Sequence, residues 1–470
     1  MLVVLAVLLA VYLIAAPMWS DEGAETTTPL PTHTVAVIDH NLLNELEIES
    51  KEANLSFVLN SSATEWDWSD NAEIPLDNMA FANFVTALNE ASTSYKIEGV
   101  TADQLAEFGL AEPALRIRFG FSDGTSKEYR FGNLNNFNSL YYFCESSATD
   151  TVYMVNSAVK ESVDLDILDF VLIETPPTIT AAKILDLNYF NGGQYRYFNY
   201  YPEGNEADYT DGYDWYFDDL SENMTSSPSE KPLDGAFADE LTDLITKLAF
   251  DKCVGLDASD EKYGFSEGRK LVIRYKADEG DKGVLTEKEY VVYIGSQTED
   301  GDIYAYTANS KLVYTLSASD DWITLLTEEA AKLMPDEIWL PNYERVDSMT
   351  FTAGGNSIEI AVKTTDGKTS YSSEKSDDAK ALAALVKALE ELKAKSNIAY
   401  FEDESAGVEK TEIFSVLVAF NQGSQPAYEI KVTRFSQSYC VVSFNGREDQ
   451  LLTLEDAQKL ADAVTAFFAG

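Results

Sequence analysis

A pattern that recurs along the chain constrains the fold more than any other feature of this sequence. A helical segment that follows Pro75-Leu76-Asp77 leads to a Phe108-Gly109-Leu110 turn, and then to strand-like runs that end at Val152-Tyr153. The same order returns, and a fainter copy follows it: Pro232-Leu233-Asp234, Tyr263-Gly264-Phe265 and Val313-Tyr314, then the region from Asp347 to the end. A chain that repeats one supersecondary unit is expected to fold as tandem domains of the same architecture.

Each copy is predicted to form an antiparallel sheet with packed helices. Two or three strand candidates come first, then an amphipathic helix preceded by an N-cap residue, Asp77 in the first copy and Asp234 in the second. Alternating runs with short polar turns follow, which favours antiparallel pairing, and a closing strand in each copy is expected to lead into a final helix. The sequence therefore predicts an α+β fold in which an N-terminal membrane helix precedes three tandem repeats. The expected parts are a signal anchor at 1–19, a stalk at 20–32, and repeat domains at 33–178, 179–340 and 341–470.

The N-terminal segment predicts where the protein resides. Leu2 to Trp19 is uncharged and almost entirely apolar, and a helix of that length spans a bilayer at about 1.5 Å per residue. Because neither an A-x-A cleavage site nor a lipobox cysteine follows, an uncleaved signal anchor is favoured over a cleaved signal peptide or a buried core helix. The protein is then expected to be a single-pass protein of the cell membrane, with the bulk of the chain extracytoplasmic.

Charge and cysteine content exclude several classes of protein. The 470 residues include 34 Lys and Arg against 80 Asp and Glu, a formal net charge of −46. Such a surface repels polyanions, so nucleic acid is not an expected partner. The three cysteines, Cys144, Cys253 and Cys440, are too few and too dispersed for a disulfide framework. They are interpreted as small buried residues, with Cys144 and Cys440 in the same strand of different repeats.

Short strings that resemble catalytic motifs are interpreted as coincidence. Gly264-Phe-Ser266-Glu-Gly268 fits the nucleophile-elbow string, but that chemistry needs a histidine after the serine, and the two histidines are His33 and His40. Ser157-Ala-Val-Lys160 fits S-x-x-K without the accompanying K-T-G. Two histidines and three dispersed cysteines predict no zinc site of ordinary spacing. The sequence thus predicts no catalytic residues, no metal and no cofactor, and a protein that is not an enzyme.

Aromatic residues gather in the second copy, between Tyr195 and Phe217. They occur at both odd and even positions of the strand expected at Gln194–Tyr201, so some are expected to point away from the core. Exposed aromatic faces bind sugars or anchor a protein partner, whereas coverage by a neighbouring repeat would make an inter-domain interface instead. The residues chosen as a speculative partner or glycan surface are Tyr195, Tyr197, Tyr200, Tyr201 and Trp215.

The turn and strand pattern also resembles a known family. Phe108-Gly109-Leu110 with Pro113, a strand that ends at Gly132, Tyr141-Tyr142 and Val152-Tyr153 are similar to the bacterial domain of unknown function 4340 family. The second copy keeps much of this pattern but lacks the proline after the turn. The resemblance implies a membrane-anchored, extracytoplasmic accessory protein, often associated with ABC-type transporters of the gliding kind, without assigned chemistry.

Three functions remain open at this point. The leading hypothesis is a non-catalytic, membrane-tethered extracytoplasmic scaffold or accessory subunit of an ABC-type transport complex, with transporter subunits as partners. The first alternative is a cell-surface module that binds a glycan or a protein through the aromatic segment. The second alternative is a hydrolase that uses dispersed carboxylates. Among 80 acidic residues, pairs of carboxylates at catalytic spacing are expected by chance, so their presence neither supports nor excludes this alternative.

Overall fold

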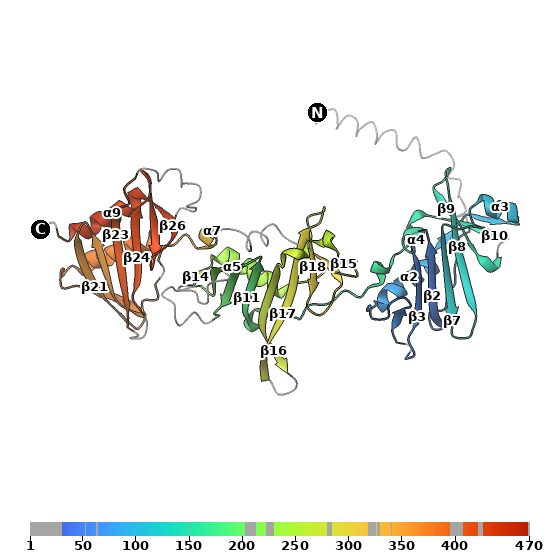
Figure 1. The fold of residues 1–470 in the computed structure, drawn as a ribbon, viewed down its shortest axis with the longest axis horizontal. Helices are drawn as coiled ribbons and strands as arrows, with labels where there is room; N and C mark the ends of the chain where they lie inside the picture. The colour runs from blue at the N-terminus through green and yellow to red at the C-terminus, as the bar shows by residue number, and fades with distance from the viewer. Residues whose placement is uncertain are drawn as a thin grey trace, which may run out of the picture. The chain divides into compact units, whose positions relative to one another are not determined.

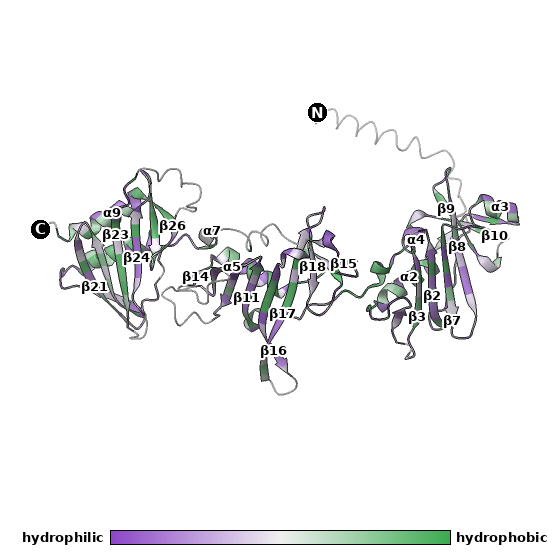
Figure 2. Ribbon diagram, viewed as in Figure 1, coloured by the Kyte–Doolittle hydropathy of each residue, from purple (hydrophilic) through white to green (hydrophobic). Residues whose placement is uncertain are grey.

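A computed structural model describes residues 31–468 except 52, 63, 149, 203–212, 222–229, 280–283, 318–325, 327–329, 340, 395–407 and 422–425. Within this part, the chain divides into two compact units, with the division between Ile173 and Glu174. The first unit contains one large antiparallel sheet and a two-stranded pair, and the second unit contains two large sheets (Figure 1). Figure 2 shows hydrophobic and hydrophilic residues mixed along the strands, as expected for sheets with one buried face.

The first sheet is formed around two hairpins that meet at its centre. Its order is β4-β3-β2-β7-β8-β9-β10-β6. The strands are β2 (Leu43–Ser50), β3 (Asn54–Leu59), β4 (Trp66–Trp68), β6 (Lys96–Glu98), β7 (Leu115–Phe121), β8 (Ser126–Asn135), β9 (Leu140–Glu145) and β10 (Thr151–Val155). Short strands β1 (His33–Thr34) and β5 (Ser92–Thr93) pair separately, and the helices are α2 (Asn78–Glu90), α3 (Ala102–Glu107) and α4 (Ser157–Glu161).

The second sheet repeats this order with one additional edge strand. Its order is β14-β13-β12-β11-β16-β17-β18-β19-β15. The elements are β11 (Ile184–Asn191), β12 (Gln194–Tyr200), β13 (Trp215–Ser221), β14 (Lys231–Pro232), α5 (Gly235–Thr246), β15 (Lys252–Gly255), β16 (Lys270–Glu279), β17 (Val284–Gln297), β18 (Ile303–Thr307) and β19 (Val313–Leu316).

The third sheet keeps the central strand order, β22-β21-β20-β23-β24-β25-β26. Its elements are β20 (Val346–Ala353), β21 (Asn356–Thr365), β22 (Lys368–Ser372), α8 (Ala379–Glu390), β23 (Glu412–Phe420), β24 (Tyr428–Arg434), β25 (Tyr439–Phe444), β26 (Arg447–Thr453) and α9 (Leu454–Ala466), preceded by the short helix α7 (Ala330–Leu333). All three sheets carry a bulge at the start of their central strand pair. It lies at Leu43/Glu45, Ile184/Asp186 and Val346/Ser348.

The central helix of each repeat covers one face of its sheet. In α2 the predicted apolar stripe is buried against strand residues such as Ile48 and Ile117, and α5 and α8 bury similar stripes. The predicted N-caps are confirmed, because Asp77 accepts a hydrogen bond from the Met79 backbone N–H at 2.8 Å and Asp234 accepts one from Ala236 at 3.0 Å. Among the described residues, the opposite face of each sheet carries no long helix stripe, although the short helix α3 packs over Cys144 and Val152 of the first sheet; this opposite face is called the open face below.

The family-like turns are packed against glycines of the sheet. Gly109 and Gly264 lie at the centre of these turns with φ of 74° and 73°. A Cβ placed on Gly132 would lie 2.2 Å from the Phe108 carbonyl oxygen, and one on Gly295 would lie 2.2 Å from the Tyr263 carbonyl oxygen. Only glycine permits such close backbone approach, so the recurring turn and the recurring glycine are parts of one contact.

The predicted α+β class is wrong. Strands dominate the described residues, and the final helix that was expected after each closing strand is only Ser157–Glu161 in the first repeat. The fold is therefore mostly β, with four antiparallel sheets in the described part of the chain. The predicted membrane helix at 1–19 and most of the stalk at 20–32 lie outside the described residues. Among the residues that are described, no helix is long and apolar enough to cross a bilayer.

Candidate functional site

The aromatic residues predicted as a surface are divided between the two faces of the second sheet. Strand alternation places Tyr195, Tyr197 and Tyr201 on the open face, because the intervening Arg196 and Phe198 are buried. The Tyr201 hydroxyl lies 3.2 Å and 3.1 Å from the two carboxylate oxygens of Glu230.

Tyr200 and Trp215 lie on the helix-covered face instead. They are register partners on β12 and β13, their ring centroids are 4.8 Å apart, and the Trp215 indole N–H donates to the Thr242 hydroxyl of α5. The structure therefore divides the predicted surface into two separate places. Three of the five predicted residues lie on the open face and two on the helix-covered face.

Cross-strand register aligns an aromatic row across five strands of the open face. Tyr195 on β12 pairs with Phe190 on β11, and Phe190 pairs with Lys270 on β16. Lys270 in turn pairs with Tyr293 on β17, and Tyr293 pairs with Tyr306 on β18. These five residues are called the aromatic row below. With strands about 4.8 Å apart, the row extends for roughly 19 Å.

The rings of the row contact one another in two clusters. Phe190 and Tyr195 have centroids 4.5 Å apart, and Tyr293 stacks on Tyr306 at 4.4 Å with an interplanar angle of 8°. The Lys270 ammonium lies between the clusters, 5.8 Å from the centroid of Phe190, which is within the range of a cation–π contact. All five side chains are half-buried. The row therefore presents ring faces and one cation that are partly accessible and held in place by their neighbours.

Further aromatic residues extend both ends of the row. Tyr197 lies on the same face of β12, 6.1 Å from Tyr195. Phe265, from the turn that packs on Gly295, meets Tyr306 edge-on at 4.7 Å. The family-like turn thus contributes an aromatic ring to the open face in addition to its close backbone contact with Gly295.

Beyond Val272 and Val291, polar groups lie on this face on the side of the bulge. Arg274 forms an ion pair with Asp186 at 3.0 Å, and Asn188 donates to the same carboxylate at 2.9 Å. Burial raises the pKa of Asp186 above the usual carboxyl value, while the Arg274 guanidinium opposes that shift. The aromatic row is therefore bordered by side chains that offer hydrogen bonds and charge.

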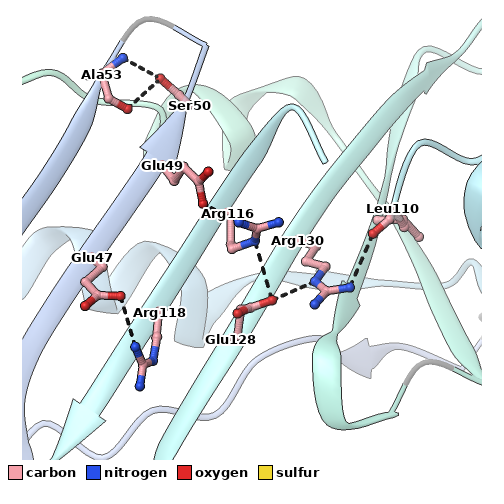
Figure 3. A network of polar contacts seen from close by, with 9 residues as sticks. All are labelled: Glu47, Glu49, Ser50, Ala53, Leu110, Arg116, Arg118, Glu128 and Arg130. Atoms are coloured by element: carbon pink, nitrogen blue, oxygen red, sulfur yellow. Dashed lines mark hydrogen bonds and ion pairs between the residues drawn. The ribbon is translucent and has the colours of Figure 1, made fainter. Parts of the chain in front are cut away.

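The open face of the first sheet has a different chemistry. Glu47 and Glu49 of β2, Arg116 and Arg118 of β7, and Glu128 and Arg130 of β8 form a lattice of alternating charge (Figure 3). The Arg118–Glu47 pair lies at 3.3 Å, two residues beyond the first pair after the bulge, whereas Arg274–Asp186 is that first pair in the second sheet. These partly exposed pairs satisfy one another, and each is worth about 0.2–1 kcal/mol.

The open face of the third sheet is mixed. Thr350, Ser357, Glu359 and Ser372 line a depression of about 630 Å³ there, and Leu417 and the Lys431–Glu412 ion pair lie on the same face. The three sheets thus share a strand order and differ in the surface they present: charged, aromatic or mixed. An aromatic row occurs on one open face among the described residues.

The catalytic-like string in the second repeat forms a structural turn. Gly264 and Gly268 both adopt left-handed φ, and Ser266 is exposed on a short 3₁₀ segment that precedes β16. The three cysteines are buried and form no disulfide among the described residues, and Cys144 and Cys440 lie on β9 and β25, the same strand of two sheets. Burial raises the pKa of each of these two thiols to about 11. Within the described residues, no cluster of His, Cys, Asp and Glu has an arrangement suited to a metal ion.

Sequence reasoning missed four members of the aromatic row. Phe190, Lys270, Tyr293 and Tyr306 lie on strands whose pairing is set by non-local contacts. One signal was available, because Asn191-Gly192-Gly193-Gln194 is a tight-turn sequence that places Phe190 opposite Tyr195. The register of β16 to β18 had no comparable local signal.

Fold and site together define a tandem-repeat, mostly β protein that presents different side-chain surfaces on one repeated scaffold. The chain belongs to the DUF4340 family, a domain of unknown function, whose profile matches residues 66–265 and 224–411 in two tandem copies. Each match covers the central helix of one repeat and the opening strands of the next.

Other comparisons add little. No curated protein matches the chain. Two solved structures show weak likeness. One is a DNA polymerase sliding clamp from Pseudomonas aeruginosa, with 11% identity over 89% of this chain and 93% of that chain and a TM-score of 0.14. The other is a putative DNA polymerase III β subunit from Eubacterium rectale, with 9% identity over 90% and 93% and a TM-score of 0.14. At these scores neither carries an argument about this chain.

Proposed function

We propose that this chain is a non-catalytic, extracytoplasmic scaffold that binds a partner protein through the aromatic row of its second sheet. The observation that carries the proposal is the row itself, which is built on one of three sheets with the same strand order. Half-buried aromatic rings held in a fixed register are typical of binding surfaces, because they give large contact area at low entropic cost. The apolar segment at 1–19 supports a location at the cell membrane, and this part of the proposal rests on sequence alone.

The proposed partner is a subunit of an ABC-type transport complex. This choice follows the family resemblance in the sequence. The row suits a protein partner because its central Lys270 offers one cation among rings, and the exposed Arg274 guanidinium, beyond Val272 on the same face, offers a second. Aromatic centres with polar rims are the usual arrangement of protein interfaces.

Photo-crosslinking in native membranes tests this proposal. A photoreactive benzoyl-phenylalanine at position 195 or 293 of the full chain is expected to give one discrete adduct that contains a transporter subunit. The matched control carries the same probe at Arg118, on the open face of the first sheet. If the two probes on the row give no adduct beyond those of the control, the row is not the binding surface.

Alanine substitution in the aromatic row measures how much one ring contributes to the binding free energy. Tyr293→Ala is expected to cost on the order of 2 kcal/mol of binding free energy, because truncated aromatic anchors in interfaces cost at least that much. The corresponding loss of affinity is about 30-fold. Tyr95→Ala, at an exposed tyrosine of the first unit, is the control and is expected to leave binding unchanged.

A glycan is the second candidate ligand, because a row of half-buried rings with Asn188 on the same face offers both aromatic contact and hydrogen bonds to a sugar. A glycan array probed with the full chain tests it. Binding that is lost in both Tyr197→Ala and Tyr293→Ala would favour this candidate, whereas signals that survive both substitutions would count against it.

A further inference from the structure

A small pocket lies on the helix-covered side of the second sheet, away from the aromatic row. It is formed where β12 ends, β13 begins and α5 starts, and its volume is about 390 Å³. That is near the lower end of the range for ligand pockets and fits a small molecule or one side chain. The described residues that line it are Tyr200, Tyr213, Asp214, Trp215, Leu233, Gly235, Ala238, Asp239 and Thr242.

Aromatic rings form the inner wall of this pocket. Trp215 is 1% exposed, and its indole N–H donates to the Thr242 hydroxyl at 3.0 Å, so the orientation of the ring is fixed. Tyr200 lies beside it at 4.8 Å between centroids with a tilt of 39°, and Tyr213 is half-buried next to them. Trp215 is almost fully covered and supports the wall from behind, so the half-buried rings of Tyr200 and Tyr213 are the ones a ligand can reach.

Carboxylates stand at the mouth of the pocket. Asp214 and Asp239 are both exposed, and among the described lining residues there is neither lysine nor arginine to neutralise them. Burial, and after it Glu337 and Asp234, raise the pKa of the Tyr213 hydroxyl, and of these two acids Glu337 is ion-paired with Lys393. The pocket thus combines an aromatic wall with a negative potential.

We propose that this pocket binds an organic ammonium ion, with the cation against the accessible rings of Tyr200 and Tyr213 and the two carboxylates, Asp214 and Asp239, at its rim. Aromatic faces attract cations through the ring quadrupole. An anionic ligand would be repelled by the carboxylates, and a bare metal ion would find rings where it requires oxygen ligands. A neutral apolar ligand would leave the charge of the site unused. The site lies on the other face of the sheet from the aromatic row, so it does not depend on the function proposed above.

An ammonium group could come from a free or lipid-borne quaternary amine or from a lysine side chain. Choline represents the first source and n-butylammonium the second. The neutral isostere 3,3-dimethylbutan-1-ol has the shape of choline without its charge. Titration calorimetry of the full chain with these three probes separates the role of charge from that of shape and ranks the two sources.

The expected result is saturable binding of at least one of the two cations, at least tenfold tighter than the neutral isostere. The double substitution Asp214→Asn with Asp239→Asn is expected to weaken that binding at least tenfold. Asp251→Asn removes one charge just beyond the end of α5 and is expected to change it less than twofold. Circular dichroism of each variant reports whether the sheet still folds, and Trp215→Phe, which keeps a ring but removes the indole, is a second probe of the pocket.

Three outcomes would overturn the proposal. It fails if neither cation binds, if the neutral isostere binds as tightly as the cations, or if the folded double variant binds the cation as tightly as the parent chain does. Preference for choline or for n-butylammonium supports the proposal in either case and identifies the source. Because the crosslinking test concerns the open face, its failure and the failure of this test are distinguishable.

Discussion

Replacing Gly295 by alanine tests how closely the Tyr263-Gly264-Phe265 turn is held against the second sheet. The new Cβ would lie 2.2 Å from the Tyr263 carbonyl oxygen, 2.8 Å from Phe265 Cε1 and 3.0 Å from Tyr304 Cβ. Since carbon and oxygen atoms normally approach to about 3.3 Å, the turn must withdraw by roughly 1 Å. The closest atom belongs to the backbone, so a rotamer change cannot relieve the clash.

The cost has two contributions. Overpacking of a tight site costs about 1–3 kcal/mol. Withdrawal of the turn also strains the hydrogen bonds from the Ser296 hydroxyl to the Tyr263 carbonyl at 3.2 Å and from the Tyr263 hydroxyl to the Val254 carbonyl at 2.9 Å. Each is worth about 1 kcal/mol. We therefore expect Gly295→Ala to destabilise the second sheet by roughly 3–5 kcal/mol.

Hydrogen exchange followed by mass spectrometry is the suitable assay, because a multi-domain chain does not unfold in a single two-state step. Protection of β17 and β18 is expected to fall in Gly295→Ala. Gly132→Ala, where the Cβ would lie 2.2 Å from the Phe108 carbonyl oxygen, is expected to do the same to β8 and β9.

The matched control is Gly235→Ala. A Cβ there meets nothing within 4 Å, and the residue begins α5, so the substitution is expected to stabilise the protein by about 0.4–1 kcal/mol. If Gly295→Ala leaves the stability of β17 and β18 within about 0.5 kcal/mol of the parent, the turn does not approach the sheet as closely as described.

Two further predictions concern titratable groups. Cys144 and Cys440 are buried with thiol pKa values of about 11, and Cys253 is buried too. Ellman's reagent at pH 8 is therefore expected to react with these thiols only after denaturant is added, and rapid reaction with the native chain would contradict this. Because burial raises the folded-state pKa of Asp186, its ionised form costs stability at neutral pH, and that cost is relieved as the pH falls through the raised folded pKa. The unfolding free energy of Asp186→Asn relative to the parent should therefore decrease between pH 7 and pH 4, and a difference that stays constant with pH would refute the assignment.

Local patterns predicted the elements of this fold well. The N-caps Asp77 and Asp234, the apolar stripe of α2 and strands such as β10 at Thr151–Val155 depend on residues near one another in sequence, and the structure confirms them. The class was wrong because the expected final helix of the first repeat stops at Glu161, after five residues. Helix length depends on tertiary packing, which a short amphipathic pattern does not report.

Local sequence patterns predicted only part of the candidate site. Alternation in β12 correctly implied that aromatics face both sides of the sheet, and Tyr195 and Tyr197 lie on the open face. Trp215 was grouped with them, but the parity of β13 directs it toward α5. Parity becomes informative across strands only when the register is known, and register between distant strands is a tertiary property.

The division between a helix-covered face and an open face also has an evolutionary consequence. When a gene segment that encodes such a sheet is duplicated, the new copy inherits a complete core together with a surface that stability hardly constrains. Selection can then change alternate residues of one strand set without disturbing the residues between them. Among relatives of this chain, substitutions should therefore accumulate in every second strand position, and the surface of Glu47, Tyr293 or Thr350 should diverge well before the core that supports it.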